Sequence, residues 1–113
     1  MERARRGEVP RISVVIPAYN AERSIGPCLE ALSRQQIEVP FEVIVVDDGS
    51  TDRTGEIATQ VPGVRVIRQP NQGPAVARNR GVAEARGAWI VFTDADCAPL
   101  PDFLARLTAP LED

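Results

Sequence analysis

The stretch FEVIVVDDGSTD, residues 41–52, shows how this chain is built. Its first part, 41–46, ends in four consecutive apolar residues without polar alternation, which is typical of a strand covered on both faces. Ser50, Thr51 and Asp52 follow as candidate caps of a helix. A buried strand that leads directly into a helix is the repeating unit of a parallel α/β sheet.

The same unit recurs along the rest of the chain. The other predicted strands are 11–16, which we expect Pro17 to end, 63–67 and 88–93. The other predicted helices are one that carries the apolar stripe Ile25, Cys28, Leu29 and Leu32, one from Gly73-Pro74 to Gly87, and a short one that begins at Pro101. This alternation predicts an α/β fold, with a parallel sheet and helices on both faces.

Composition restricts the class of protein. The chain has 113 residues, a net charge of −3 and no histidine, which argues against nucleic-acid binding and excludes imidazole bases and ligands. Cys28 and Cys97 are far apart in the sequence, and we expect both to be reduced, buried small residues in a cytoplasmic protein. We find no secretory signal, and no run reaches the roughly 18 apolar residues of a membrane segment. Residues 1–10 are predicted to form a flexible arm.

Polar residues gather where three of the predicted strands end. The segment 17–22 follows the first strand, 47–50 follows the second and 93–96 follows the fourth. Ligands of open parallel sheets bind in the crevice beyond the carboxyl ends of the strands. We therefore expect these three segments to meet at one site.

Asp94 and Asp96 predict a metal at this site. Their side chains point the same way if the extended backbone continues through Ala95, so both carboxylates can reach one hard cation. Mg²⁺ or Mn²⁺ would need further ligands, which substrate phosphates usually supply. The alternative is that these aspartates only cap the following turn. Asp47 and Asp48 are adjacent, so at most one of them is expected to enter the crevice.

The third predicted helix adds basic and amide groups. Asn79 falls on its apolar stripe, where an amide needs a hydrogen-bond partner. That stripe consists of Ala75, Val76, Val82 and Ala83. Arg78 and Arg80 flank Asn79, and an arginine fork suits a metal-bound phosphate. The alternative for both arginines is a solvated helix face.

Three segments together resemble a known family. They are SVVIPAYNAERSIGPCLEAL (13–32), VIVVDDGSTDRTGEIA (43–58) and NQGPAVARNRGVAEARGAWIVFTDADC (71–97). In order and spacing they resemble the nucleotide-sugar-binding half of family 2 glycosyltransferases, which have a Rossmann-like GT-A fold. The resemblance covers about residues 11–108.

The resemblance implies roles for residues at the nucleoside end of the site. Pro17, Ala18 and Tyr19 would form the loop that walls the nucleobase, and Glu22 would lie near the base or ribose. Either Asp47 or Asp48 would accept a hydrogen bond from the base, which is commonly uracil.

It also implies roles at the sugar-phosphate end. Gly73 would let the backbone pass close to the ligand, and Arg78 and Asn79 would line the sugar-phosphate site. Asp94 would approach the ribose or the metal shell, and Asp96 would bind the Mg²⁺ or Mn²⁺ that bridges the diphosphate.

The implied activity is inverting transfer of a sugar, most often from a UDP-sugar, to the hydroxyl of an unidentified acceptor. Family members carry the catalytic base well downstream of the D-x-D motif, so we assign no base here and expect 11–113 to be the donor-binding half of a truncated or longer enzyme. Such a parent protein can associate with a membrane. The unpaired sheet edge beside the fourth strand predicts self-association.

Other classes fit less well. A non-catalytic nucleotide-binding or interaction module, left by truncation, is the main alternative. A dinucleotide-binding oxidoreductase needs a glycine-rich turn after the first strand, where this chain has proline, tyrosine and asparagine. A nucleotidyltransferase needs a glycine-rich triphosphate loop followed by lysine, and the chain contains no lysine.

Overall fold

The computed structural model describes residues 9–112, so most of the predicted arm, residues 1–8, lies outside the described part. Strands and helices alternate in the order β1 (Ile12–Ala18), α1 (Ile25–Ser33), β2 (Phe41–Asp47), α2 (Thr54–Thr59), β3 (Val64–Arg68), α3 (Pro74–Glu84), β4 (Trp89–Phe92), α4 (Phe103–Thr108) and a final 3₁₀ turn, η1 (Ala109–Glu112). The predicted alternation of strands and helices is confirmed.

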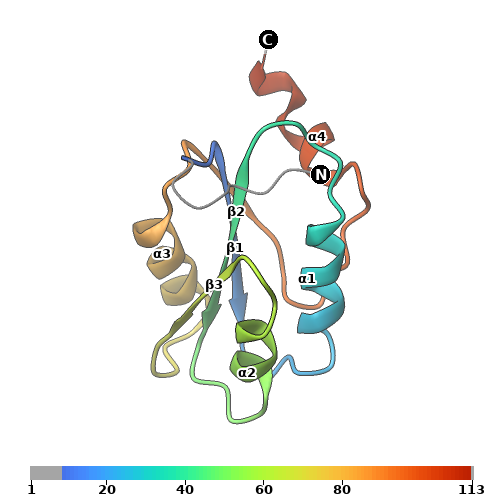
Figure 1. Ribbon diagram of the computed structural model, residues 1–113. Helices are drawn as coiled ribbons and strands as arrows, with labels where there is room; N and C mark the ends of the chain where they lie inside the picture. The colour runs from blue at the N-terminus through green and yellow to red at the C-terminus, as the bar shows by residue number, and fades with distance from the viewer. Residues whose placement is uncertain (1–8, 113) are drawn as a thin grey trace.

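The four strands form one parallel sheet in the order β3-β2-β1-β4. Helices α1 and α2 lie on one side of it and α3 on the other, and the strands run away from α4 (Figure 1). The predicted parallel sheet with helices on both faces is confirmed. Because all strands run the same way, their carboxyl ends meet at one edge of the molecule.

The larger core lies between the sheet and α1. The apolar stripe predicted for α1 is buried, and Pro27 lies in the first turn, where its missing N–H leaves no bond unmade. The stripe packs against alternate residues of the central strands, including Ile12, Val14, Ile16, Val43 and Val45. Alternation along each strand sends the intervening side chains to the opposite face.

Helix α3 packs on that opposite face through small residues. Its buried positions are Ala77 and Gly81, and a Cβ on Gly81 would lie 2.3 Å from Cγ1 of Val15. The stripe predicted for this helix is wrong: Val76 and Val82, for example, are 38% and 42% exposed. The helix lies so close to the sheet that only small side chains fit beneath it.

Strand β1 passes through Pro17, whereas the sequence predicted that Pro17 ends it. The pairing of β1 with β4 stops at Val15, whose carbonyl accepts a bond from the Thr93 N–H at 3.3 Å. Alternation places the Pro17 nitrogen on the same side as Val15, beyond the last residue of β4. Because β4 has already ended, residue 17 does not need to donate a hydrogen bond to it, so proline is tolerated at this position.

Several boundaries shift from the predicted ones. Helix α2 begins at Thr54, and of its three candidate caps it is Asp52 whose carboxylate accepts the Thr54 N–H, at 2.9 Å. Helix α3 ends at Glu84 rather than at Gly87. None of the helices within residues 9–112 is long and apolar enough to cross a membrane.

A buried carboxylate stabilises the amino end of the sheet, opposite the edge where the carboxyl ends of the strands meet. Glu42 is 5% exposed and accepts bonds from the Ser13 hydroxyl at 2.6 Å and the Arg86 N–H at 2.8 Å. Burial by itself would raise the pKa of Glu42, but these hydrogen bonds and the nearby Arg86 guanidinium hold it below its ordinary value. The network ties β1 and β2 to the turn that leads into β4.

The two helical glycines make a matched stability test. Gly81→Ala should destabilise the chain by about 1 to 3 kcal/mol, because its new methyl overlaps Val15. Gly26→Ala in α1 is the control, since its methyl would meet Ile57 at an ordinary 3.8 Å. It should be neutral or stabilising by up to about 1 kcal/mol. Urea denaturation measures both; equal losses in the two variants would contradict the close approach of α3.

Candidate functional site

The structure brings three strand ends together around a cavity of about 190 Å³. Its lining residues are Pro17, Ala18, Tyr19, Asp48, Pro74, Arg78, Asp94 and Ala95. They come from the end of β1, the residue after β2, the start of α3 and the turn after β4. A nucleotide sugar is larger than this space, so such a ligand would extend beyond the cavity along the strand ends.

Asp48 forms the most heavily bonded part of this cavity wall. One carboxylate oxygen accepts bonds from the Gln69 side chain at 2.9 Å and the Gln72 N–H at 2.8 Å. The other accepts bonds from the Asn71 side chain at 3.2 Å and the Gly73 N–H at 3.0 Å. Burial alone would raise the pKa of Asp48, but the bonds from Gln69, Gln72 and Gly73 hold it below its ordinary value. Asp48 therefore stays ionised and fixes the loop 69–73.

The neighbouring Asp47 faces away from the cavity. It is fully buried, and its Oδ1 accepts the Ser50 N–H at 3.0 Å. Its Oδ2 forms an ion pair with the Arg68 Nε at 3.2 Å, and a Cβ on Gly55 would overlap this oxygen. The two adjacent aspartates thus serve opposite sides of the sheet, as expected from strand alternation.

Glu22 and Asn20 tie the loop after β1 to the loop after β2. The Glu22 carboxylate accepts the Arg53 N–H at 3.4 Å, and the Asn20 carboxamide oxygen accepts the Thr51 N–H at 2.9 Å. Asn20 adopts a positive φ of 49°, which its short side chain tolerates. Glu22 is exposed and lies outside the cavity lining, so the structure gives it a role in loop packing.

Helix α3 presents one of its predicted residues to the cavity. Arg78 is half-buried and lines the cavity, whereas Asn79 and Arg80 are exposed and are not among its lining residues. Gly73 precedes the helix with a φ of 99°, a conformation that favours glycine, and its N–H goes to Asp48. Gly73 is therefore beside the cavity without lining it.

The turn after β4 gathers the predicted metal ligands. Strand β4 ends at Phe92, and the Cys97 N–H donates to the Asp94 carbonyl at 3.1 Å, so the backbone does not continue extended through Ala95. The side-chain donor atoms of Asp94, Asp96 and Cys97 nevertheless lie within 4.8 Å of one another. Asp94 lines the cavity, while Asp96 lies just outside it. Carboxylates this close repel unless a cation joins them, so the donor set fits a divalent metal.

Cys28 lies beneath this turn. It is fully buried on α1, and its thiol donates to the Asp94 carbonyl at 3.6 Å. Burial first, and then the nearby Cys97, Asp96 and Asp94, raise the pKa of Cys28 to about 11. Cys28 is thus an uncharged support for the turn. The predicted burial is confirmed for Cys28 and wrong for Cys97, which is exposed because it lies in the surface turn after β4.

Sequence reasoning missed several residues of this region. Pro74 and Ala95 line the cavity, and Gln69, Asn71 and Gln72 bind Asp48. The signal available was the amide-rich loop QPNQG, because amide groups are natural donors to a buried carboxylate.

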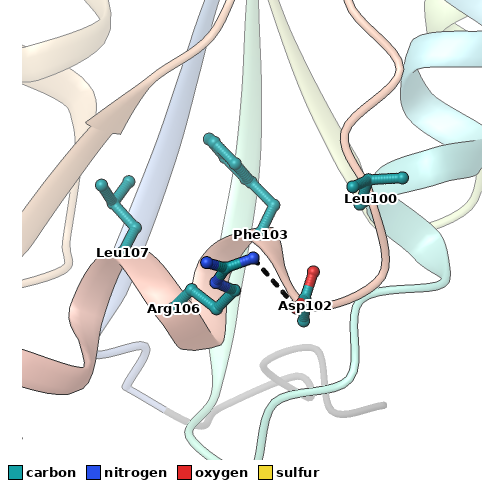
Figure 2. Close-up of a pocket in the computed structure, with 5 residues that line it drawn as sticks. All are labelled: Leu100, Asp102, Phe103, Arg106 and Leu107. Atoms are coloured by element: carbon teal, nitrogen blue, oxygen red, sulfur yellow. Dashed lines mark ion pairs between the residues drawn. The ribbon is translucent and has the colours of Figure 1, made fainter.

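A larger cavity of about 410 Å³ lies at the opposite end of the molecule, beside α4. Figure 2 shows the Asp102–Arg106 ion pair, 3.8 Å long, with Leu107 and Leu100 on either side. The Gln36 N–H donates to the Pro101 carbonyl, which places this segment against the end of α1. Within residues 9–112 its lining comes from α4 and the segment just before it and not from the carboxyl end of a strand, and its arginine is already paired. It is therefore a poorer candidate for binding a charged ligand.

Comparison with known proteins identifies the class. The family model "Glycosyl transferase family 2" matches residues 13–113, so the chain belongs to this family. It is 40% identical over 108 residues to the uncharacterized glycosyltransferase EpsJ of Bacillus subtilis, covering 92% of this chain and 31% of that protein. The chain therefore spans about a third of the length of the curated relatives it matches.

Solved structures show the same fold. S. aureus TarS 1-349 in complex with UDP-GlcNAc has a TM-score of 0.82 at 33% identity, over 90% of this chain and 31% of that one. The mannosyltransferase PcManGT of Pyrobaculum calidifontis, in complex with GDP-Man and Mn²⁺, has a TM-score of 0.81 at 31% identity, over 99% and 35%. The Rossmann-like, GT-A type of sheet implied by the family resemblance is confirmed.

The loop function of Asp48 can be tested without any ligand. Asp48→Asn places an amide among the N–H donors of Gln72 and Gly73, so amide exchange in residues 69–74 should accelerate by roughly 10- to 100-fold. Hydrogen exchange read by mass spectrometry measures this. Asp52→Asn is the control, because it makes the same change at another carboxylate that accepts a backbone N–H, that of Thr54, and makes no hydrogen bond with this loop in the described part of the chain. Unchanged exchange in Asp48→Asn would show that other contacts hold the loop.

Proposed function

We propose that residues 11–113 form the nucleotide-sugar-binding half of a family 2 glycosyltransferase that transfers a sugar, with inversion, to an acceptor hydroxyl. The observation that supports this most is the meeting of three strand ends in one cavity, whose lining includes Arg78 together with Asp48 and Asp94. Ligands of parallel sheets bind at such a place. A guanidinium beside acidic residues can bind a diphosphate that also carries a metal.

The nucleoside would lie against the loop after β1. Tyr19 is 51% exposed at the cavity, so its ring is free to stack on a base, with Pro17 and Ala18 beside it. Asp48 is the acidic residue that faces this loop, whereas Asp47 is on the far side of the sheet. Because four donors already occupy the Asp48 carboxylate, a base N–H would have to replace one of them.

The diphosphate would lie between α3 and the turn after β4. Arg78 would bind its oxygens, and the Gly73 backbone leaves room for the ligand, since nothing lies within 4 Å of a Cβ built there. We propose that Glu22 and Asn79, which are outside the cavity lining, act through their loop and helix rather than by direct contact.

Asp94 and Asp96 would hold a divalent ion, Mg²⁺ or Mn²⁺, at the diphosphate. When bound, the ion neutralises the charge that grows on the leaving nucleoside diphosphate. The Mn²⁺ in PcManGT supports a divalent ion. The nucleotides in the two similar structures differ, UDP-GlcNAc in one and GDP-Man in the other. We propose a UDP-sugar, and a comparison of UDP with GDP binding tests this choice.

We also propose that the chain self-associates through β4. β4 is an edge strand of the sheet, and Phe92 at its end is 47% exposed. An unpaired edge with an apolar side chain favours pairing with another chain. Sedimentation velocity over a range of protein concentrations tests this; a single monomer at all concentrations would contradict it.

The binding proposal predicts metal-dependent nucleotide affinity. By calorimetry, the chain should bind UDP more tightly with Mn²⁺ than with EDTA, by roughly tenfold or more. Asp96→Asn should remove most of this difference, because it takes away one of the two carboxylates of the ion site.

Asp102→Asn is the matched control, since it removes an exposed carboxylate near α4, away from the strand ends. It should leave both affinities unchanged. A folded sample that binds neither UDP nor GDP would contradict the proposed function, and equal affinity with Mn²⁺ and EDTA would contradict the metal.

A further inference from the structure

We infer that Cys97 is a third protein ligand of the divalent ion at this site, so that the site prefers borderline or soft cations to Mg²⁺. This inference rests on the proposed function, because it concerns the ion that Asp94 and Asp96 would hold. It adds a sulfur donor to a site otherwise described by carboxylates alone.

The geometry comes from the turn after β4. The bond from the Cys97 N–H to the Asp94 carbonyl folds the backbone so that residue 97 returns to the side of residue 94. As a result, one oxygen of each aspartate and the Cys97 sulfur all lie within 4.8 Å of one another. Two donors bound to one ion at 2.0 to 2.3 Å are at most roughly 4.5 Å apart. All three side chains are exposed, so small torsional changes bring them to this distance.

The Cys97 sulfur is free to take part. Its hydrogen bond in the described part of the chain is a long one, 3.9 Å, to the Asp96 carboxylate that it would share the ion with. Binding an ion would replace this weak contact. Cys28, by contrast, is fully buried and bonded to the Asp94 carbonyl, so it supports the turn from below.

The donor set decides which cations suit the site. Mg²⁺ takes oxygen ligands in a strict octahedron, and sulfur does not replace them. Thiolate ligands favour Zn²⁺ and other softer ions, and affinity across divalent first-row metals rises from Mn²⁺ through Co²⁺. Two carboxylates with one thiolate therefore favour Co²⁺, Zn²⁺ and Cd²⁺ strongly and tolerate Mn²⁺. For Mg²⁺ the site supplies only the two carboxylate oxygens as ligands.

Cobalt is the probe, because a sulfur ligand gives Co²⁺ a charge-transfer absorption band in the near ultraviolet that oxygen ligands do not give. The whole 113-residue chain is titrated with Co²⁺, with and without UDP, as the unchanged protein and as Cys97→Ser and Cys28→Ala. We expect the band in the unchanged protein and in Cys28→Ala, and its loss in Cys97→Ser. Cd²⁺ affinity should fall at least roughly tenfold in Cys97→Ser, with Mg²⁺ affinity unchanged.

The outcomes separate this inference from the proposed function. If the protein binds Co²⁺ and UDP but shows no sulfur band, or if Cys97→Ser keeps the band, the inference is wrong and the proposed function stands. If the folded protein binds UDP but neither Co²⁺ nor Mn²⁺, the metal site and the inference both fail. Cys97 is exposed, so circular dichroism of Cys97→Ser should match the unchanged protein and exclude unfolding as the cause.

Discussion

Asp48 is only 3% exposed, and its carboxylate accepts four hydrogen bonds from the segment that leads into α3. A buried charge is stable only when donors of this kind replace its lost hydration. The same bonds join the end of β2 to the start of α3 and so bring Pro74 and Arg78 to the cavity. The glycine that follows, Gly49, has a positive φ of 75°, and a Cβ there would lie 2.6 Å from the Asn71 nitrogen. The two segments are therefore in close backbone contact as well.

The carboxylates at the strand ends divide into two kinds. Asp47 and Asp48 are buried and are engaged by the chain itself, Asp48 by N–H donors and Asp47 by the Ser50 N–H and an ion pair with Arg68. Asp94 and Asp96 are exposed, and within residues 9–112 neither carboxylate receives an ion pair or a bond from an N–H group. The buried aspartates hold the loops in place. The exposed aspartates keep their oxygens available, which is what a site for an external cation requires.

The sequence predicts the sheet well because β-branched runs and short connections leave few other topologies. It also predicts the place of the site, since strand ends follow from strand positions. It does not predict features that depend on contacts with other parts of the chain. Whether Asn79 or Ala77 faces the sheet depends on how α3 is rotated, and a helix of small residues carries little periodic signal. The contact that occupies Glu22 forms with a loop 31 residues away, beyond the reach of a local pattern.

The packing of α3 also sets the position of its arginine. Arg78 and Gly81 are three residues apart, so they lie on neighbouring turns of one helix face. Gly81 rests on Val15, in the strand whose continuation carries Pro17 and Ala18 into the cavity wall. A larger side chain at 81 would push the helix off the sheet and carry the Arg78 guanidinium away from the loop after β1. Because cavity and core share this short stretch of helix, the close fit against Val15 fixes the width of the candidate site as well as the stability of the fold.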